Sequence, residues 1–220
     1  EAALGRFRDL LAKLPLEYIQ VSNDIISYAK KELSVSLNQN VYITLTDHIS
    51  FALERFQNNM NFANALHSEI RRFYPAEYSV GIHALQLIAE KTGVLLPEDE
   101  ASTIALHLVN AELNLRVRDI WALTEIMGRI MEQITTFMPI LKAESLEMDW
   151  LLSDLKFILC RVLTLKPLKE NGDPALLAFM QDCCPELIRL VTDIAVLLQK
   201  EYNCHMTKEE QLYLVVSLKR

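Results

Sequence analysis

The sequence has few glycines, no long apolar run and no excess of basic residues. Only 5 of its 220 residues are Gly while 51% are hydrophobic, so it can bury large cores but has few positions for tight backbone turns. No stretch approaches the roughly 18 consecutive apolar residues of a membrane-spanning helix, and we expect no membrane insertion. The net charge of −7 argues against direct nucleic-acid binding by this segment, because surfaces that bind phosphate backbones are normally basic.

Motifs of catalysis and metal binding are also missing. The sequence has no Gly-rich phosphate loop, no G-x-S-x-G, no H-E-x-x-H, no C-x-x-C, and no two histidines at i, i+4. Asp99 and Glu100 are adjacent, but carboxylates in a first helical turn are explained by the helix dipole without catalysis. We therefore predict no enzyme, no catalytic residue, no metal and no cofactor. Four irregularly spaced cysteines and the lack of a signal peptide favour the cytoplasm.

The feature present almost everywhere is helical periodicity, with apolar residues at spacings of three and four. The pattern predicts a helix over about 4–33 that is bent or broken at Pro15, and a second one carrying Ile43 to Phe56. A helix opening at Leu96–Glu100 continues through Ala111. Further helices are expected at about 64–73, 75–91, 119–138, 146–164, 174–183, 185–202 and 207–219. No strand pattern competes, so the predicted class is all-α.

The two halves of the chain repeat each other. At an offset of 106, His48 and Arg55 align with Asp154 and Arg161. At an offset of 110, the aligned pairs are Pro75 with Pro185, Glu100 with Glu210, Ile104 with Leu214, and His107 with Ser217. A longer loop around 167–174 absorbs the difference of four. The simplest architecture is two tandem homologous five-helix bundles, residues 1–116 with an N-terminal linker helix and residues 117–220.

The repeat makes two of the five histidines candidates for function. His48 lies at the edge of an apolar helix stripe, and His107 lies in the apolar run Ile104–Leu108. Taken alone, each is more often a partly buried helix residue than a functional one. Both, however, fall in segments where the repeat is clearest, and their partners Asp154 and Ser217 are not histidines.

The same segments resemble a known family. Residues 45–49 (LTDHI), 96–100 (LPEDE) and 104–113 (IALHLVNAEL) closely resemble the first phosphotransferase-system regulation domain of sugar-operon transcriptional antiterminators of the BglG/LicT/SacY type. The second half, ending in residues 210–214 (EQLYL), resembles the second such domain. The resemblance covers nearly the whole chain.

That resemblance implies a homodimer of regulation domains that meets RNA only through a small N-terminal domain outside this sequence. His48 and His107 would be phosphoacceptors of the inhibitory first domain, receiving phosphate from the sugar-specific permease (EIIB), with HPr as a further candidate donor. Asp47 would be the neighbour that orients His48. A neutral imidazole is a competent nucleophile near neutral pH, and a phosphoryl group brings close to two negative charges that bias a bistable assembly.

The second domain departs from the family pattern. Its acceptor histidines would align with Asp154 and Ser217, so these are degenerate acceptor positions and control of this domain by HPr is in doubt. Asp154 is interpreted equally well as a permanent charge that imitates a phosphorylated state or as a solvated helix residue.

Two other functions fit the same sequence. The regulation domains of a DNA-binding activator of a sugar operon would look similar, and so would a helical dimerisation scaffold whose histidines are never modified. The tandem spacing and the long N-terminal helix favour the antiterminator.

Overall fold

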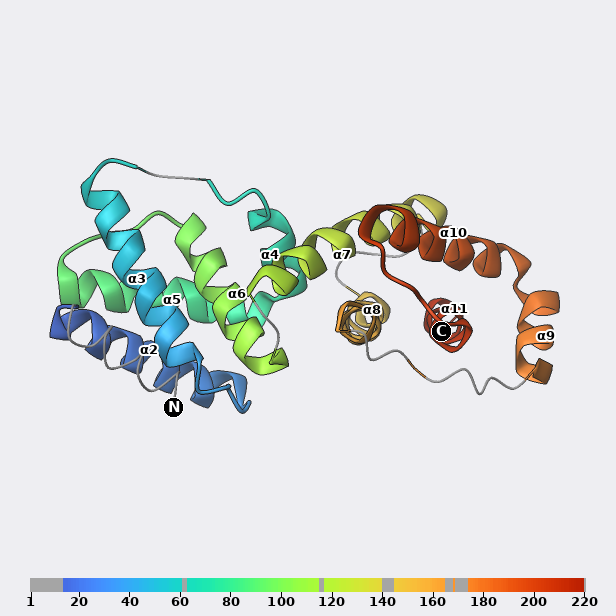
Figure 1. The fold of residues 1–220 in the computed structure, drawn as a ribbon, viewed down its shortest axis with the longest axis horizontal. Coiled ribbons are helices and arrows are strands. Elements are labelled where there is room, and N and C mark those ends of the chain that lie inside the picture. The colour runs from blue at the N-terminus through green and yellow to red at the C-terminus, as the bar shows by residue number, and fades with distance from the viewer. Residues whose placement is uncertain are drawn as a thin grey trace. The chain divides into compact units, whose positions relative to one another are not determined.

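A computed structural model describes residues 14–60, 63–114, 117–139, 145–164, 168 and 174–219. Within these ranges the chain forms helices and no strands, which confirms the all-α class (Figure 1). The expected helix N-terminal to Pro15 lies outside the described residues. None of the helices described is both long and apolar enough to cross a bilayer.

The chain divides into two compact units, one extending to Thr124 and the other beginning at Glu125. The first contains α2 (Leu16–Leu33), α3 (Val41–Gln57), α4 (His67–Phe73), α5 (Pro75–Thr92) and α6 (Asp99–Leu113). The helix α7 (Val117–Phe137) contributes residues to both units. The second continues with α8 (Leu146–Leu163), α9 (Pro174–Cys183), α10 (Pro185–Tyr202) and α11 (Lys208–Lys219).

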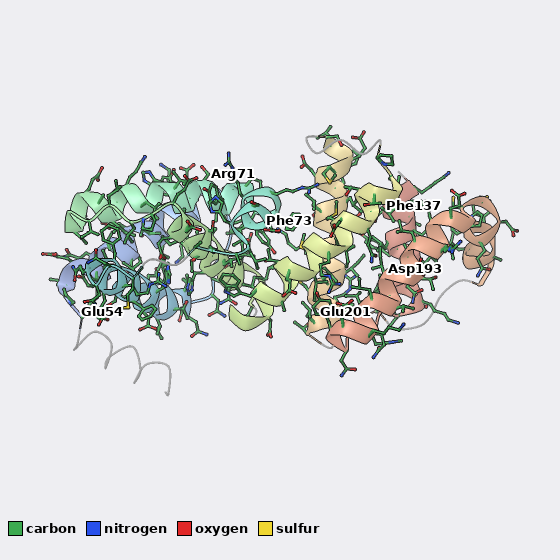
Figure 2. All side chains as sticks on the ribbon, turned by 90° about the horizontal axis from the view of Figure 1, so that it is seen from above. Glu54, Arg71, Phe73, Phe137, Asp193 and Glu201 are labelled. Atoms are coloured by element: carbon green, nitrogen blue, oxygen red, sulfur yellow. The ribbon has the colours of Figure 1, made fainter. Side chains whose placement is uncertain are left out.

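In the first unit, α5 packs against both α2 and α6, and α3 packs against the other side of the same two helices (Figure 1). Its core consists of fully buried aliphatic side chains spaced three or four residues apart, including Ile25, Leu45, Ile49, Ile88, Ile104 and Leu108. This spacing gives each helix one apolar face, and burial of those faces holds the unit together. Glu54, labelled in Figure 2, lies on the exposed side of α3.

The second unit repeats part of this arrangement, with α11 packed against α8 and α10, and α9 against α10. Its core includes Leu155, Ile158, Ile194 and Leu214. On its surface, Arg129 of α7 donates to Glu201 and to the hydroxyl of Tyr202, both at the end of α10 (Glu201 is labelled in Figure 2).

A glycine sets the distance between α5 and α6. A Cβ placed on Gly81 would lie 3.0 Å from the carbonyl carbon of Ala101 and closer still to its oxygen. Two helix backbones can approach this closely only where one of them has no side chain. At the repeat offset of 110, the second unit has Val191 instead of Gly81, and Val191 is buried.

The observed helix bounds lie within a few residues of the predicted ones. The main difference is α4, which was expected from about Asn64 and begins at His67. Asn64 is used differently: its backbone N–H donates to Asp99 at 2.6 Å and its side-chain oxygen accepts from the N–H of Leu66 at 3.0 Å. An Asn side chain that bonds two residues ahead offers the backbone an alternative to helix, which explains the later start.

Candidate functional site

The structure brings His48 and His107 together. His48 lies on α3 and His107 on α6, two helices in direct contact, and the centroids of the two imidazole rings are 5.0 Å apart with their planes tilted by 33°. The two residues are 59 positions apart in the sequence, so their proximity is produced by the fold of the first unit.

Glu100 and Arg55 complete this site. Oε2 of Glu100 lies 3.1 Å from Nε2 of His48, an ion-pair distance, although the angles are not those of a hydrogen bond. Oε1 of Glu100 accepts a hydrogen bond from Nη2 of Arg55. The carboxylate therefore lies between a guanidinium and an imidazole, with one oxygen toward each. We refer to His48, His107, Glu100 and Arg55 as the His48 cluster.

The His48 cluster is largely sheltered from water. Side-chain exposure is 11% for His48, 7% for Glu100 and 16% for Arg55. His107 is half-buried as a residue, but its Nδ1 is buried and has no hydrogen-bond partner among the described residues. Burial, and then the nearby His48, lower the pKa of His107 from 6.5 to about 3. The His107 imidazole is therefore neutral at physiological pH.

Asp47 lies elsewhere. It is exposed on α3, and the carboxylate found beside the His48 ring is that of Glu100. The orienting role expected of Asp47 stays a prediction, and Glu100 is a second candidate for it.

At the matching positions of the second unit, Asp154 and Ser217 also meet. Oδ2 of Asp154 accepts from the Ser217 hydroxyl at 2.7 Å, and its Oδ1 accepts from the Tyr213 hydroxyl at 2.9 Å. Asp154 is on α8, and the two hydroxyl groups are on α11. We refer to these three residues as the Asp154 cluster. The positions that the repeat aligned thus lie next to each other within each unit.

The glutamate and arginine are also repeated, with different geometry. Oε1 of Glu210 lies 3.4 Å from Nε of Arg161 and accepts from the N–H of Leu168 at 3.2 Å. Oε2 of Glu210 accepts from the N–H of Thr207 at 3.1 Å, and the Thr207 hydroxyl accepts from the N–H of Glu210 at 3.3 Å. This reciprocal pair is a capping box at the start of α11.

The first unit has no such box at α6. The residue that matches Thr207 is Pro97, which has neither a hydroxyl nor an N–H. Glu100 therefore has no capping partner at that position, and both of its carboxylate oxygens face α3, one toward Arg55 and the other toward His48.

Sequence reasoning found the histidine pair but not the roles of Glu100 and Arg55. The repeat aligned both residues with Glu210 and Arg161, which was the available signal. Glu100 was explained as helix-start electrostatics, an explanation that accounts for the residue type and does not predict which side chain the carboxylate faces.

The remaining histidines are outside the site. His67 Nδ1 lies 2.9 Å from the Ser102 hydroxyl, His83 stacks on Tyr28 with ring centroids 4.0 Å apart, and His205 is exposed. Within the described part of the chain, no group of three or more His, Cys, Asp or Glu residues could hold a metal ion. What the His48 cluster offers chemically is imidazole nitrogen in a sheltered setting beside a fixed carboxylate.

Comparisons with known proteins find relatives along nearly the whole chain. The sequence model of the PRD domain family matches residues 23–111. Transcription antiterminator LicT of Bacillus subtilis (strain 168) is 38% identical over 216 residues, 98% of this chain and 78% of that protein. The Beta-glucoside operon antiterminator of Dickeya chrysanthemi is 32% identical, covering 98% of this chain and 76% of that protein. The crystal structure of GlcT CAT-PRDI aligns with a TM-score of 0.49 at 36% identity, covering 51% of this chain and 67% of that one.

Proposed function

Because this chain belongs to the family of transcription antiterminators that carry PRD regulatory domains, we propose that it senses sugar supply through phosphorylation of His48 and His107. The relatives are regulators of transcription and not enzymes, and the chain is a regulatory module. In the proposal, the phosphotransferase permease (EIIB) is the donor, HPr is a second donor, and the setting is the cytoplasm.

The observation that carries this proposal is the convergence of two imidazoles on one sheltered site. The ring centroids are 5.0 Å apart, and the pKa of His107, lowered to about 3, keeps that ring unprotonated at pH 7. An unprotonated ring nitrogen has the lone pair that a nucleophile needs. Its lone pair forms the new N–P bond, while the bond from phosphorus to the donor atom breaks and its electron pair leaves with the donor.

The phosphoryl group would act through charge. It brings close to two negative charges to a site that already holds the Glu100 carboxylate. Like charges at this distance repel strongly where water is scarce, so the modified first unit is expected to rearrange around Arg55 and α3. In a protein that has two stable assemblies, such a rearrangement at one site can shift the equilibrium between them.

The second part of the proposal is that the module is a homodimer. Trp150, Asp154 and Phe157 follow one another at spacings of four and three, so they share one face of α8. Trp150 is 52% exposed and Phe157 is 55% exposed, and both flank the position that matches His48. A second copy of the chain would cover these apolar side chains, and a charge at Asp154 would then lie at the edge of the contact.

The phosphorylation proposal is tested by incubating the chain with phospho-HPr, or with the permease and phosphoenolpyruvate-driven carriers, and mapping the acid-labile phosphate. We expect label on His48 or His107, and none on the double variant His48→Gln/His107→Gln. The matched control is His67→Gln/His83→Gln, which leaves the site intact and should label normally. Phosphate found only on other residues would refute the proposal.

The dimer proposal is tested by sedimentation of the variant Trp150→Ser/Phe157→Ser. We expect the Kd of the dimer to rise by about tenfold or more, the effect of losing central apolar anchors. Val196→Ser is the control, because Val196 is 44% exposed on α10 and lies on a different helix. An unchanged Kd in the α8 variant would rule out this face as the contact.

A further inference from the structure

The two histidines of the His48 cluster bury different ring nitrogens. In His48 the buried nitrogen is Nε2, and in His107 the buried nitrogen is Nδ1. A donor in solution cannot reach a buried atom, which leaves Nδ1 of His48 and Nε2 of His107 as the candidate acceptor atoms.

Glu100 adds an electrostatic reason on the His48 side. Its Oε2 lies 3.1 Å from Nε2 of His48, and Glu100 is itself fixed by Arg55. If Nε2 were the unprotonated nitrogen, its lone pair would face a carboxylate oxygen, and the two would repel each other. A proton on Nε2 turns this repulsion into attraction, which leaves the lone pair of the neutral ring on Nδ1.

We propose that Glu100 is the positioning residue for His48, and that the two acceptors form different isomers: Nδ1-phosphohistidine at His48 and Nε2-phosphohistidine at His107. This inference rests on the proposed function, since it states at which atoms the same site is modified. Glu100 does not contact the reacting nitrogen. It acts through the ring, by holding the proton on the opposite nitrogen.

The bond changes are the same at both rings, with the nitrogens exchanged. At His48, the Nδ1 lone pair forms the N–P bond, the donor atom departs with the electron pair of its own bond to phosphorus, and the Nε2 proton stays facing Glu100. At His107, the Nε2 lone pair forms the N–P bond, and the ring proton is on Nδ1. No oxidant, reductant or metal is needed for either step.

The isomers are measured in two single-acceptor variants of the full chain, His107→Gln and His48→Gln. Each is phosphorylated with the protein donors, or with phosphoramidate as a small-molecule donor, and read by ³¹P NMR and isomer-specific phosphohistidine antibodies. We expect an excess of about tenfold of the Nδ1 isomer at His48 and of the Nε2 isomer at His107, equivalent to a barrier difference of ~1.4 kcal/mol. The same isomer at both residues would overturn the proposal.

The role of Glu100 is measured without any phosphoryl group. Long-range ¹H–¹⁵N spectra at alkaline pH report which nitrogen of each neutral imidazole carries the proton. We expect His48 to be protonated on Nε2 in the wild type, and this preference to be lost in Glu100→Gln, whose amide can donate toward Nε2. In Asp47→Asn the preference should be unchanged, because Asp47 is exposed.

The matched control in the other unit is Glu210→Gln, which changes the equivalent glutamate and should leave the His48 tautomer as it is. If Asp47→Asn moves the His48 proton and Glu100→Gln does not, then Asp47 is the positioning residue and the proposal fails. If the wild-type ring is protonated on Nδ1, the proposal also fails, whether or not the variants fold. Complete absence of label with the expected tautomer would instead contradict the proposed function and leave Glu100 in its positioning role.

Discussion

The His48 and Asp154 clusters occupy equivalent positions in the two units but present different chemistry. In the first, two imidazoles face each other 5.0 Å apart beside Glu100. In the second, a carboxylate accepts hydrogen bonds from two hydroxyl groups, those of Ser217 and Tyr213. The Asp154 cluster has no lone-pair nitrogen, so it cannot be phosphorylated as a histidine site.

The glutamate and arginine persist behind both clusters. Each ion pair connects two equivalent helices. Arg55 and Glu100 join α3 to α6, and Arg161 and Glu210 join α8 to α11. The framework of the site and its reactive groups are therefore separable. A unit can lose its acceptors and keep the ion pair that joins the two helices.

The largest expected effect comes from restoring the missing acceptors. In a His48→Gln/His107→Gln background, Asp154→His/Ser217→His should raise phosphate incorporation in the second unit from background to the level of a genuine acceptor. The physical reason is that the framework pair Arg161–Glu210 is already in place. Peptide mapping of acid-labile phosphate after incubation with phospho-HPr measures it.

The control for this exchange is Asp154→Asn/Ser217→Ala in the same background, which should stay unlabelled. If the double-histidine variant folds and is not labelled, the framework and the reactive groups of the site are not separable.

The next largest effect is on the stability of the second unit. Glu210 is fully buried and is paired with Arg161 and the backbone N–H groups of Thr207 and Leu168, so Glu210→Ala should lower the free energy of unfolding by about 3–5 kcal/mol. Glu100→Ala should cost about 1–3 kcal/mol, because Glu100 has no capping partner to lose. Urea denaturation followed by circular dichroism compares the two, and an equal loss would contradict the assigned difference.

The third prediction compares the stability effects of substitutions at two equivalent helix contacts, Gly81 in the first unit and Val191 in the second. Helix propensity alone predicts that Gly81→Ala stabilises the chain by about 1 kcal/mol. The position of the Ala101 carbonyl predicts the opposite, a loss of about 1–3 kcal/mol, because an added Cβ would clash with backbone. At the equivalent position, Val191→Ala should cost about 1.5 kcal/mol from lost apolar burial alone. A rise in Tm for Gly81→Ala would refute the close approach of α5 and α6.

The smallest expected effect is a pH dependence contributed by His107 of the first unit. The pKa of His107 is about 3 in the folded chain and 6.5 is its ordinary value, so the unfolded chain takes up the proton first as the pH falls below 7. Stability is therefore lost between pH 6.5 and 3, by about 2 kcal/mol or less from pH 7 to 5. His107→Gln should flatten this part of the urea-denaturation profile, and an unchanged profile would contradict the shift.

Much of this architecture could be predicted from the sequence. Apolar spacing predicted the helices because each one buries a single face, and the repeat marked His48 and His107 as candidates because they align with Asp154 and Ser217. The direction of the Glu100 side chain could not be predicted, since it depends on the distance between α3 and α6. The late start of α4 was missed because Asn64 bonds across to Asp99, a residue 35 positions away.

The residue type at position 97 bears on how such domains diverge in evolution. With threonine at this position, as in the second unit, one oxygen of the glutamate three residues later closes a capping box and only the other reaches the neighbouring helix; with proline, both oxygens are available to that helix. A single codon one turn away from the site can therefore change the reactivity of a histidine without altering any residue that contacts the phosphoryl donor. Gene duplication followed by drift at this one position would give two domains graded in sensitivity before either lost an acceptor.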